Sequence, residues 1–371
     1  MKFPSWLTVM SISEYFAGTY REARNNFLAA ARTAGTKLTH YTLPNLYGPE
    51  NEELVVDVAR LGPNNPTRIL MLISATHGVE GFCGSGCQVG YLTDQLYNVL
   101  PANAGAILIH ALNPFGFARL RRVNEDNVDL NRNFQDFSKE LPSSSLYEPL
   151  HNWLVPKDWD GDQRRTADAA LKKYISDFGI QRFQASVSGG QYSRPTGLFY
   201  GGIRESWSNR VFRQILGEHV SSATKEMAVL DFHTGLGKSG FGEPIYLGSD
   251  EEGFKRARKW YGEEVKSTDL GTSVSANVTG SVADAFRRSA SQLEVTYLVL
   301  EFGTIPILEV LTALRADHWL HAVPNRVTGL RDAIKRQIRD AFYVDAPWWK
   351  AAVYVRSADF ALRATRALGS S

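Results

Sequence analysis

Four nearly continuous apolar runs constrain the fold of this chain more than any other feature of its sequence. They are RILMLISA (68–75), GAILIHAL (105–112), MAVLDFHT (227–234) and VTYLVLEF (295–302). Runs of this length and character are typical of strands that are buried on both faces of a sheet. Helical stretches lie between them, near 83–98, 166–178, 206–220, 251–266 and 281–291. This alternation predicts an α/β sheet with helices on both faces.

The two ends of the chain are expected to add further elements to this sheet. Residues 12–34 have the spacing of an amphipathic helix, and two strands follow, the second of them over 53–61. Residues 306–343 are predicted to form helices that are interrupted near Pro324. The final stretch, RATRALGSS, is expected to be frayed.

The stretch from about 135 to 205 is less regular than the rest of the chain. It contains LPSSSLYEPL, VPKDWDGD and the glycine-rich GGQYSRPTGLFYGG. Because regular strand–helix units resume after it, we interpret it as an insertion on the sheet rather than as a separate domain. The chain is therefore expected to form one domain over 1–371, with a core at about 53–345.

The charge balance and the apolar pattern exclude some classes of partner. The 41 basic residues nearly balance the 39 acidic ones, for a formal charge of +2, which argues against a broad face for nucleic acid or acidic membranes. No run of 18 or more apolar residues occurs, so a membrane-spanning helix is not expected. Pro4 and several serines interrupt the apolar residues near the start, which leaves no signal-peptide pattern and predicts a cytoplasmic location.

Three residues that often carry chemistry are expected to be structural here. Cys83 and Cys87 lie four positions apart, whereas a redox pair usually reads C-x-x-C, and we interpret both as buried free thiols. His110 lies within a buried strand and is expected to be a core histidine.

A candidate metal site emerges where two of the apolar runs end. His77 and Glu80 follow the first run, in ISATHGVEGF, and His233 ends another, in VLDFHTG. In open α/β sheets, ligands bind at the carboxyl ends of strands. A short-spaced pair with a distant third ligand, here two histidines and one glutamate, is a known catalytic zinc set that leaves one position open for water.

Two carboxylates close to these residues have more than one interpretation. Asp231 points to the same face of its strand as His233, so it is either an acceptor for the imidazole or a structural strand-end residue. Glu301 ends the very apolar run in LVLEFGT, where an unpaired charge would be costly. It either faces the metal cavity, where it would take a proton from water, or pairs with an arginine at the sheet edge.

The stretch NPFGFARLRRVNEDNVDLNRNF (113–134) supplies the fourth element. It holds several arginines among turn-forming residues, and arginine presents a planar fork that suits carboxylates and oxyanions. Together, HGVEG, NPFGFxxxRRVNxxxVDLNRNF, DFHTG and LEFGT resemble the zinc carboxypeptidase family, of which carboxypeptidase A is the best-known member. The chain is most similar to its bacterial branch, which also resembles murein-peptide amidases and aspartoacylase-type deacylases. The resemblance runs from about 55 to 310.

The resemblance implies a role for each matching residue. His77, Glu80 and His233 would bind one Zn²⁺ per chain. Arg122 would polarise the scissile carbonyl, and Glu301 would act as general base and then as acid. Asn131 and Arg132 would clamp a substrate carboxylate. The family folds as a single α/β catalytic domain with a mixed, mostly parallel, eight-stranded twisted sheet.

Two departures from the family pattern concern substrate choice. The family's mobile tyrosine has no counterpart in TSVSANVTGSVADAF, where its position falls near Ser275, and Tyr192 or Tyr200 of the insertion could fill that space. The insertion at about 135–205 is longer than a minimal family member needs. We expect it to shape the mouth of the active site.

The resemblance therefore implies a zinc-dependent hydrolase that cleaves an amide bond next to a free carboxylate. Its substrate would be a small peptide or an N-acyl amino-acid-like molecule. The alternatives are a small-molecule amidase or deacylase of the aspartoacylase type, a non-catalytic binding module, and a metal-free α/β transferase. A binding module would be expected to lack a metal ligand or the general base. The sequence has all four of these residues, which argues against a binding module: His77, Glu80, His233 and Glu301. Cobalt or manganese can occupy such sites in place of zinc.

Overall fold

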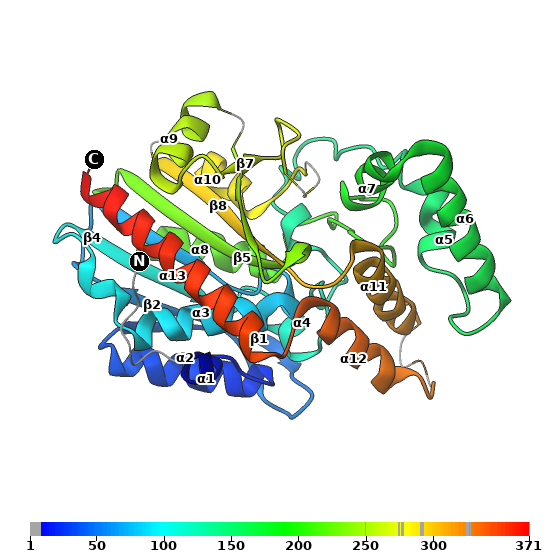
Figure 1. Ribbon diagram of the computed structural model, residues 1–371, viewed down its shortest axis with the longest axis horizontal. Coiled ribbons are helices and arrows are strands. Elements are labelled where there is room, and N and C mark those ends of the chain that lie inside the picture. Colours follow the sequence, from blue (N-terminus) through cyan, green and yellow to red (C-terminus); the bar gives the residue numbers. More distant parts are fainter. Residues whose placement is uncertain are drawn as a thin grey trace.

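The computed structural model describes residues 9–248, 250–273, 275, 278–289, 293–323, 326 and 328–370. Within these residues the chain forms an eight-stranded sheet with the strand order β1-β2-β4-β3-β5-β8-β6-β7 (Figure 1). The strands are β1 (Lys37–Tyr47), β2 (Glu53–Leu61), β3 (Arg68–Ile73), β4 (Ala104–His110), β5 (Glu226–Ser239), β6 (Gly242–Tyr246), β7 (Lys266–Ser267) and β8 (Glu294–Gly303).

The four apolar runs are the four central strands. Strands β4, β3, β5 and β8 lie side by side and are parallel. Strand β2 is antiparallel to β4 on one side, and β6 is antiparallel to β8 on the other. The prediction of an α/β fold with a mixed, mostly parallel, eight-stranded sheet is confirmed.

Helices cover both faces of the sheet. The longer helices are α2 (Tyr20–Thr33), α3 (Gly81–Thr93), α6 (Asp162–Phe178), α7 (Ile180–Ser188), α8 (Trp207–His219), α9 (Glu251–Tyr261), α10 (Val282–Ser289), α11 (Ile307–His321), α12 (Arg331–Phe342) and α13 (Pro347–Ser370). The short ones are α1 (Val9–Ser13), α4 (Pro114–Ala118) and α5 (His151–Leu154), with 3-10 turns η1 (Gly78–Glu80), η2 (Leu96–Val99), η3 (Leu130–Arg132) and η4 (Glu148–Leu150).

The alternation of side chains along each strand divides the core into two layers. In β3, Leu70 and Leu72 pack with α2, α3, α9 and α13. Ile69, Met71 and Ile73 point the other way and pack with α8 and α10. Because both faces are covered, the central strands need apolar side chains at nearly every position, which is why they are recognisable in the sequence.

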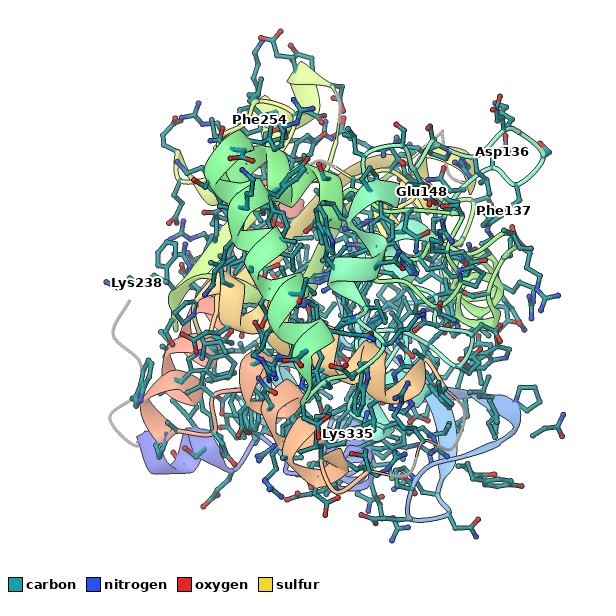
Figure 2. All side chains as sticks on the ribbon, turned by 90° about the vertical axis from the view of Figure 1, so that its right-hand side faces the viewer. Asp136, Phe137, Glu148, Lys238, Phe254 and Lys335 are labelled. Carbon is teal, nitrogen blue, oxygen red and sulfur yellow. The ribbon has the colours of Figure 1, made fainter. Side chains whose placement is uncertain are left out.

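The insertion and helices α11 and α12 form a third packed region beside the sheet. Apolar side chains of α6 and α7 join those of α11 and α12 in one cluster. Arg315 of α11 pairs with Asp168 of α6 at 2.6 Å and donates to the carbonyl of Leu154. Helices α5, α6 and α7 lie at the right of Figure 1, and they stand in front in Figure 2, which views the molecule from that side.

Some boundaries differ from the sequence-based expectations. The helix predicted over 12–34 is two helices, because the side-chain oxygen of Thr19 caps α2 by accepting from the Glu22 N–H at 3.1 Å. The expectation of a frayed C-terminus is wrong, since α13 continues to Ser370 and buries Leu368 completely. The predicted break near Pro324 lies outside the described residues.

Of the helices in the described part of the chain, none is both long enough and apolar enough to cross a membrane, the 24-residue α13 included.

Candidate metal centre

The predicted site residues come together at the carboxyl ends of the central strands. His77 follows β3, and Glu80 ends the short turn η1 that leads into α3. His233 lies on β5, directly opposite Glu301 on β8 in the sheet register. Strand ends of a parallel sheet meet at one edge, so residues that are far apart in sequence converge there.

Two glycines of the sequence motifs allow this loop to approach its neighbour. Gly78 lies against Gly116 so closely that a Cβ atom on Gly78 would come within 2.1 Å of the Gly116 carbonyl carbon. The Gly78 N–H donates to the Arg122 carbonyl at 3.1 Å, and the Val79 N–H donates to the Arg121 carbonyl at 2.8 Å. The backbone of the arginine-rich stretch therefore holds the loop that carries His77 and Glu80.

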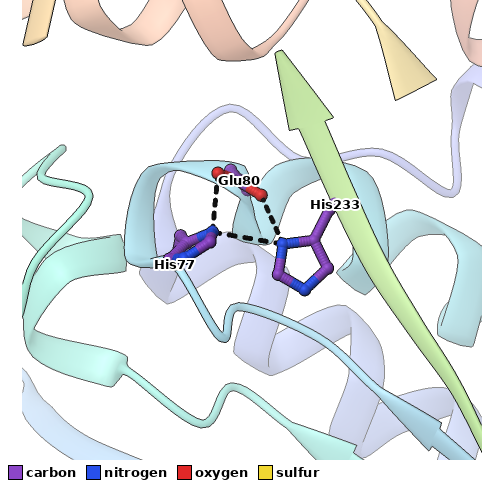
Figure 3. Close-up of side chains that lie close together, drawn as sticks. All are labelled: His77, Glu80 and His233. Carbon is purple, nitrogen blue, oxygen red and sulfur yellow. Dashed lines mark hydrogen bonds and ion pairs between the residues drawn. The ribbon is translucent and has the colours of Figure 1, made fainter. Parts of the chain in front are cut away.

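Three candidate ligand groups face one another in a buried cluster (Figure 3). His77 Nδ1 lies 2.9 Å from Glu80 Oε1, and His233 Nδ1 lies 3.1 Å from Glu80 Oε2. The two Nδ1 atoms lie 3.1 Å apart. All three side chains are almost inaccessible to solvent, with exposed fractions of 1–3%.

Two further carboxylates hold the outer nitrogens of the imidazoles. His77 Nε2 lies 3.1 Å from Asp129 Oδ1, and His233 Nε2 lies 2.9 Å from Asp231 Oδ2. When each Nε2–H donates to its aspartate, each Nδ1 presents a lone pair to the interior of the cluster. This carboxylate–histidine arrangement is typical of metal-ligating histidines, so the residues present fit a bound metal ion. Of the two interpretations of Asp231, the structure supports the acceptor for the imidazole.

The electrostatics of the cluster favour a positive charge among its members. Burial by itself would raise the pKa of the Glu80 carboxyl, but His77 and His233 hold it well below its usual range. Burial would likewise lower the pKa of His233, yet the charge and hydrogen bond of Asp231 raise it well above its usual value. The first shift favours the anionic carboxylate of Glu80, and the second favours the protonated imidazole of His233, in spite of the burial of both groups.

Glu301 lies in the same cavity with a different electrostatic environment. Burial, and then the negative charge of Glu80, raise its pKa to about 8. Its Oε1 accepts a hydrogen bond from the Leu236 N–H at 3.0 Å. Among the described residues no arginine forms an ion pair with Glu301, so the alternative of a sheet-edge pair with arginine is not what the structure shows.

The two arginines predicted to belong to the site, Arg122 and Arg132, differ in their partners. Arg122 lies 2.9 Å from Asp129 and 3.1 Å from Glu80, so it is tied to the candidate metal ligands. Arg132 is 4% exposed and has no carboxylate within ion-pair distance in the part of the chain that the structure describes. It donates instead to the backbone carbonyls of Asn131 and Ser188. Its guanidinium is therefore a buried cation without an anionic partner.

Asn131 lies beside Arg132 with its amide orientation fixed. Its Oδ1 accepts from the Val282 N–H at 3.0 Å, which turns Nδ2 away from α10. Both Asn131 and Arg132 line the cavity that contains the metal cluster and Glu301. The structure thus brings all seven predicted site residues to one cavity.

The cavity has a volume of about 1030 Å³, part of which is open to solvent. Apart from the seven predicted residues, it is lined by Ile180, Phe183, Gln184, Val187, Ser188, Phe199, Thr234, Gly235, Leu236, Ile245, Leu247, Thr268, Ser275, Val278, Val299, Ile307, Leu308, Val310, Leu311, Leu314 and Phe342. The lining residues between 180 and 199 belong to the insertion, which therefore contributes to the wall of the cavity.

No tyrosine is among the described residues that line the cavity. The Tyr192 hydroxyl donates to the Arg132 carbonyl at 2.8 Å, and the backbone carbonyl of Tyr200 accepts from the Asp129 N–H. Neither of them lines the cavity. Ser275 does line the cavity, but part of the stretch around it lies outside the described residues.

Two residues of the site were not predicted from the sequence. Asp129 lies within the DLNRNF motif, so its position in that motif was the available signal. Phe199 has left-handed backbone angles (φ 53°) and places its ring 5.2 Å from the Arg122 guanidinium and 5.8 Å from that of Arg132. Its sequence context, a glycine-rich loop, carries no comparable signal, because the contact depends on how the insertion folds back.

Comparison with solved structures finds carboxypeptidases and related proteins. Carboxypeptidase A from Helicoverpa armigera is 15% identical, with 95% of this chain and 76% of that chain covered and a TM-score of 0.44. A metallo-carboxypeptidase from Pseudomonas aeruginosa is 14% identical, with 93% and 71% covered and a TM-score of 0.40. Bovine thrombin-activatable fibrinolysis inhibitor is 12% identical, with 97% and 99% covered and a TM-score of 0.48.

A search of curated proteins finds no match. Comparison with protein families finds one that covers most of the chain, over residues 16–356. The chain belongs to this family, which is described as "Protein of unknown function (DUF2817)".

Proposed function

We propose that this protein is a zinc-dependent hydrolase that cleaves an amide bond next to a free carboxylate. The observation that carries the proposal is the convergence of His77 Nδ1, Glu80 and His233 Nδ1 in one cavity with Glu301 and Arg132. Two histidines and one glutamate form a known catalytic zinc set. The cavity therefore combines a candidate metal site, a candidate base and a buried cation without a carboxylate partner.

One zinc ion per chain would be held by His77, Glu80 and His233. When bound, zinc lowers the pKa of water and polarises a carbonyl group. Asp129 and Asp231, which lie 3.1 Å and 2.9 Å from the outer nitrogens of His77 and His233, would orient both imidazoles for metal binding.

Glu301 is the candidate general base. Its carboxyl is buried, and the Leu236 N–H fixes one of its oxygens. A raised pKa suits a group that first takes a proton from water and then passes it to the leaving nitrogen, because catalytic pKa values near the working pH serve both steps.

Arg122 is the candidate donor to the carbonyl oxygen of the scissile bond. Its guanidinium is oriented by Asp129 and Glu80, beside the candidate metal ligands. A preorganised donor of this kind contributes about 3 kcal/mol to stabilising a developing oxyanion.

Arg132 and Asn131 are the candidate clamp for the substrate carboxylate. A buried guanidinium without an anionic partner is costly unless a ligand supplies one. A free carboxylate on a small peptide or an N-acyl amino acid has the charge and planar shape to accept its donors.

The proposal is tested by metal analysis combined with an assay for amine release. The purified protein is assayed on N-acyl amino acids and dipeptides with a free carboxylate, before and after chelation and after zinc is restored. We expect hydrolysis that is lost with the metal and regained with zinc. Hydrolysis that continues after the metal has been removed would contradict the proposal.

A further inference from the structure

Helices α7 and α11 form one side of the cavity with matching apolar faces. The lining residues of α7 are Ile180, Phe183, Gln184 and Val187, and those of α11 are Ile307, Leu308, Val310, Leu311 and Leu314. The four residues of α7 follow the spacing i, i+3, i+4, i+7, and so do Ile307, Val310, Leu311 and Leu314 of α11, with Leu308 beside them. Each helix therefore turns one continuous stripe toward the cavity. We call these nine residues the helical wall.

The helical wall is open to solvent where both helices begin. Ile180 is 41% exposed, Ile307 36% and Leu308 47%. Further along the same helices, Val187 and Leu314 are buried. From Ile307 to Leu314 the stripe is about 10 Å long. The wall is therefore an apolar groove that leads from solvent into the site.

The cavity residues on strands β6 and β8 are closed to solvent. Ile245 is 1% exposed and Val299 5%. Val278 lies four residues before Val282, whose N–H holds Asn131. A substrate whose carboxylate is bound by Arg132 can place the adjoining apolar side chain in this closed region, which leaves the open groove for the other half of the molecule.

The side chains of the helical wall indicate which chemical group the other half of the substrate, the acyl half, should carry. It contains no charged side chain, and Gln184 is its single polar one. The nearby Ser188 carbonyl already accepts from Arg132. A peptide would bring backbone N–H and C=O groups against this surface, and each one left without a partner costs binding free energy. A hydrocarbon chain has no such groups.

We propose that the acyl half of the substrate is an aliphatic chain, so that the preferred substrates are N-acyl amino acids with a medium-length acyl group. This inference rests on the proposed function, because it assigns the part of the substrate beyond the scissile amide. The groove belongs to the same cavity as the site and is apolar except at Gln184, so affinity should grow with each methylene that leaves water.

The test uses N-acetyl-, N-hexanoyl- and N-decanoyl-leucine together with an alanine-rich tetrapeptide that ends in leucine. We expect kcat/KM to rise by about twofold to fourfold for each buried methylene. The tetrapeptide should be a poorer substrate than N-decanoyl-leucine. No dependence on acyl length, or a preference for the peptide, would overturn the proposal.

A pair of matched variants locates the effect. The double variant Ile180→Ser/Leu308→Ser replaces two partly exposed residues of the helical wall, so the fold should tolerate it. In this double variant, kcat/KM should depend less on acyl length than in the wild type. Leu146→Ser is the control, because Leu146 is similarly exposed (52%) and does not line the cavity. A double variant that keeps the wild-type dependence would place the acyl chain elsewhere.

Equilibrium binding separates this inference from the proposed function. The Glu301→Gln variant is titrated with N-acetyl- and N-decanoyl-leucine by calorimetry. Tighter binding of the decanoyl compound without turnover by the wild type would support the groove and contradict the hydrolase. Turnover by the wild type with equal binding of both compounds would support the hydrolase and contradict the groove.

Discussion

The Nδ1 atoms of His77 and His233 lie 3.1 Å apart, and each faces a different oxygen of the Glu80 carboxylate. The outer nitrogens lie beside carboxylates, since His77 Nε2 is 3.1 Å from Asp129 and His233 Nε2 is 2.9 Å from Asp231, and the Arg122 guanidinium also lies 2.7 Å from His77 Nε2. Two imidazole nitrogens and a carboxylate in such proximity favour a positive charge among them. The cluster therefore suits a cation, and the aspartates behind the imidazoles stabilise that charge as well.

The aspartate behind His233 should control metal affinity. Asp231→Asn removes the charge that orients the His233 ring, and we expect zinc affinity to fall about 10- to 100-fold. Asp57→Asn is a matched control, because Asp57 is also fully buried and lies 2.5 Å from a histidine, His40, away from the site. The control should lose stability without losing zinc affinity, measured by competition with a chromogenic chelator. Equal losses of zinc affinity in both variants would mean that Asp231 supports the folded structure and not the metal site in particular.

Replacing the candidate base should separate metal binding from turnover. Glu301→Gln keeps the shape of the side chain and removes its ability to take a proton. We expect the variant to retain zinc and to lose at least about 100-fold in kcat. A variant with nearly the wild-type kcat on an authentic substrate would show that another group accepts the proton.

The carboxylate clamp should make a free carboxylate obligatory. An amidated substrate leaves the donors of Arg132 unpaired, so we expect about 100-fold discrimination between acid and amide. Arg132→Ala should raise KM for the acid and reduce the discrimination between acid and amide. Arg132→Lys should restore this discrimination only in part, because a point charge does not reproduce the planar fork of arginine. Arg194→Ala, at an exposed ion pair with Glu148, is the control. Equal kcat/KM for acid and amide on the wild type would refute the clamp.

Acid should destabilise the protein through a buried histidine outside the site. Burial lowers the pKa of His110 to about 4 from its usual 6.5, so below pH 6.5 the unfolded chain takes up a proton that the folded chain refuses. Stability is therefore retained above pH 6.5 and lost as the pH falls toward 4, by on the order of 3 kcal/mol. His110→Phe, which keeps a ring against Phe27, should show a shallower loss in denaturant titrations at several pH values. Identical pH profiles for both proteins would exclude His110 as the source.

The parts of the fold that were predictable are those with local signals. The central strands are buried on both faces, so their apolar runs are unmistakable, and His77, His233 and Glu301 follow from where those runs end. The buried free thiols Cys83 and Cys87 were also predicted correctly. His110 is buried as expected, with Nε2 on Ser85, although its Nδ1 has no partner among the described residues.

The parts that were missed depend on contacts between distant segments. Strand β6 starts at Gly242 and contains Pro244, so nothing local marks it as a strand that pairs with β8. Helix α13 is ordered to its end because Ala364 and Leu368 are completely buried. The helical wall combines two helices that are more than 100 residues apart in sequence, and their spacing gives no sign that they meet.

Whether His77, Glu80 and His233 hold a zinc ion can be read from the metal content of three purified proteins. The wild type should contain one zinc per chain by elemental analysis. His233→Ala should lose most of it while circular dichroism shows a folded protein. His151→Ala, in the insertion and outside the cluster, should keep it. Full zinc content in His233→Ala would contradict the account.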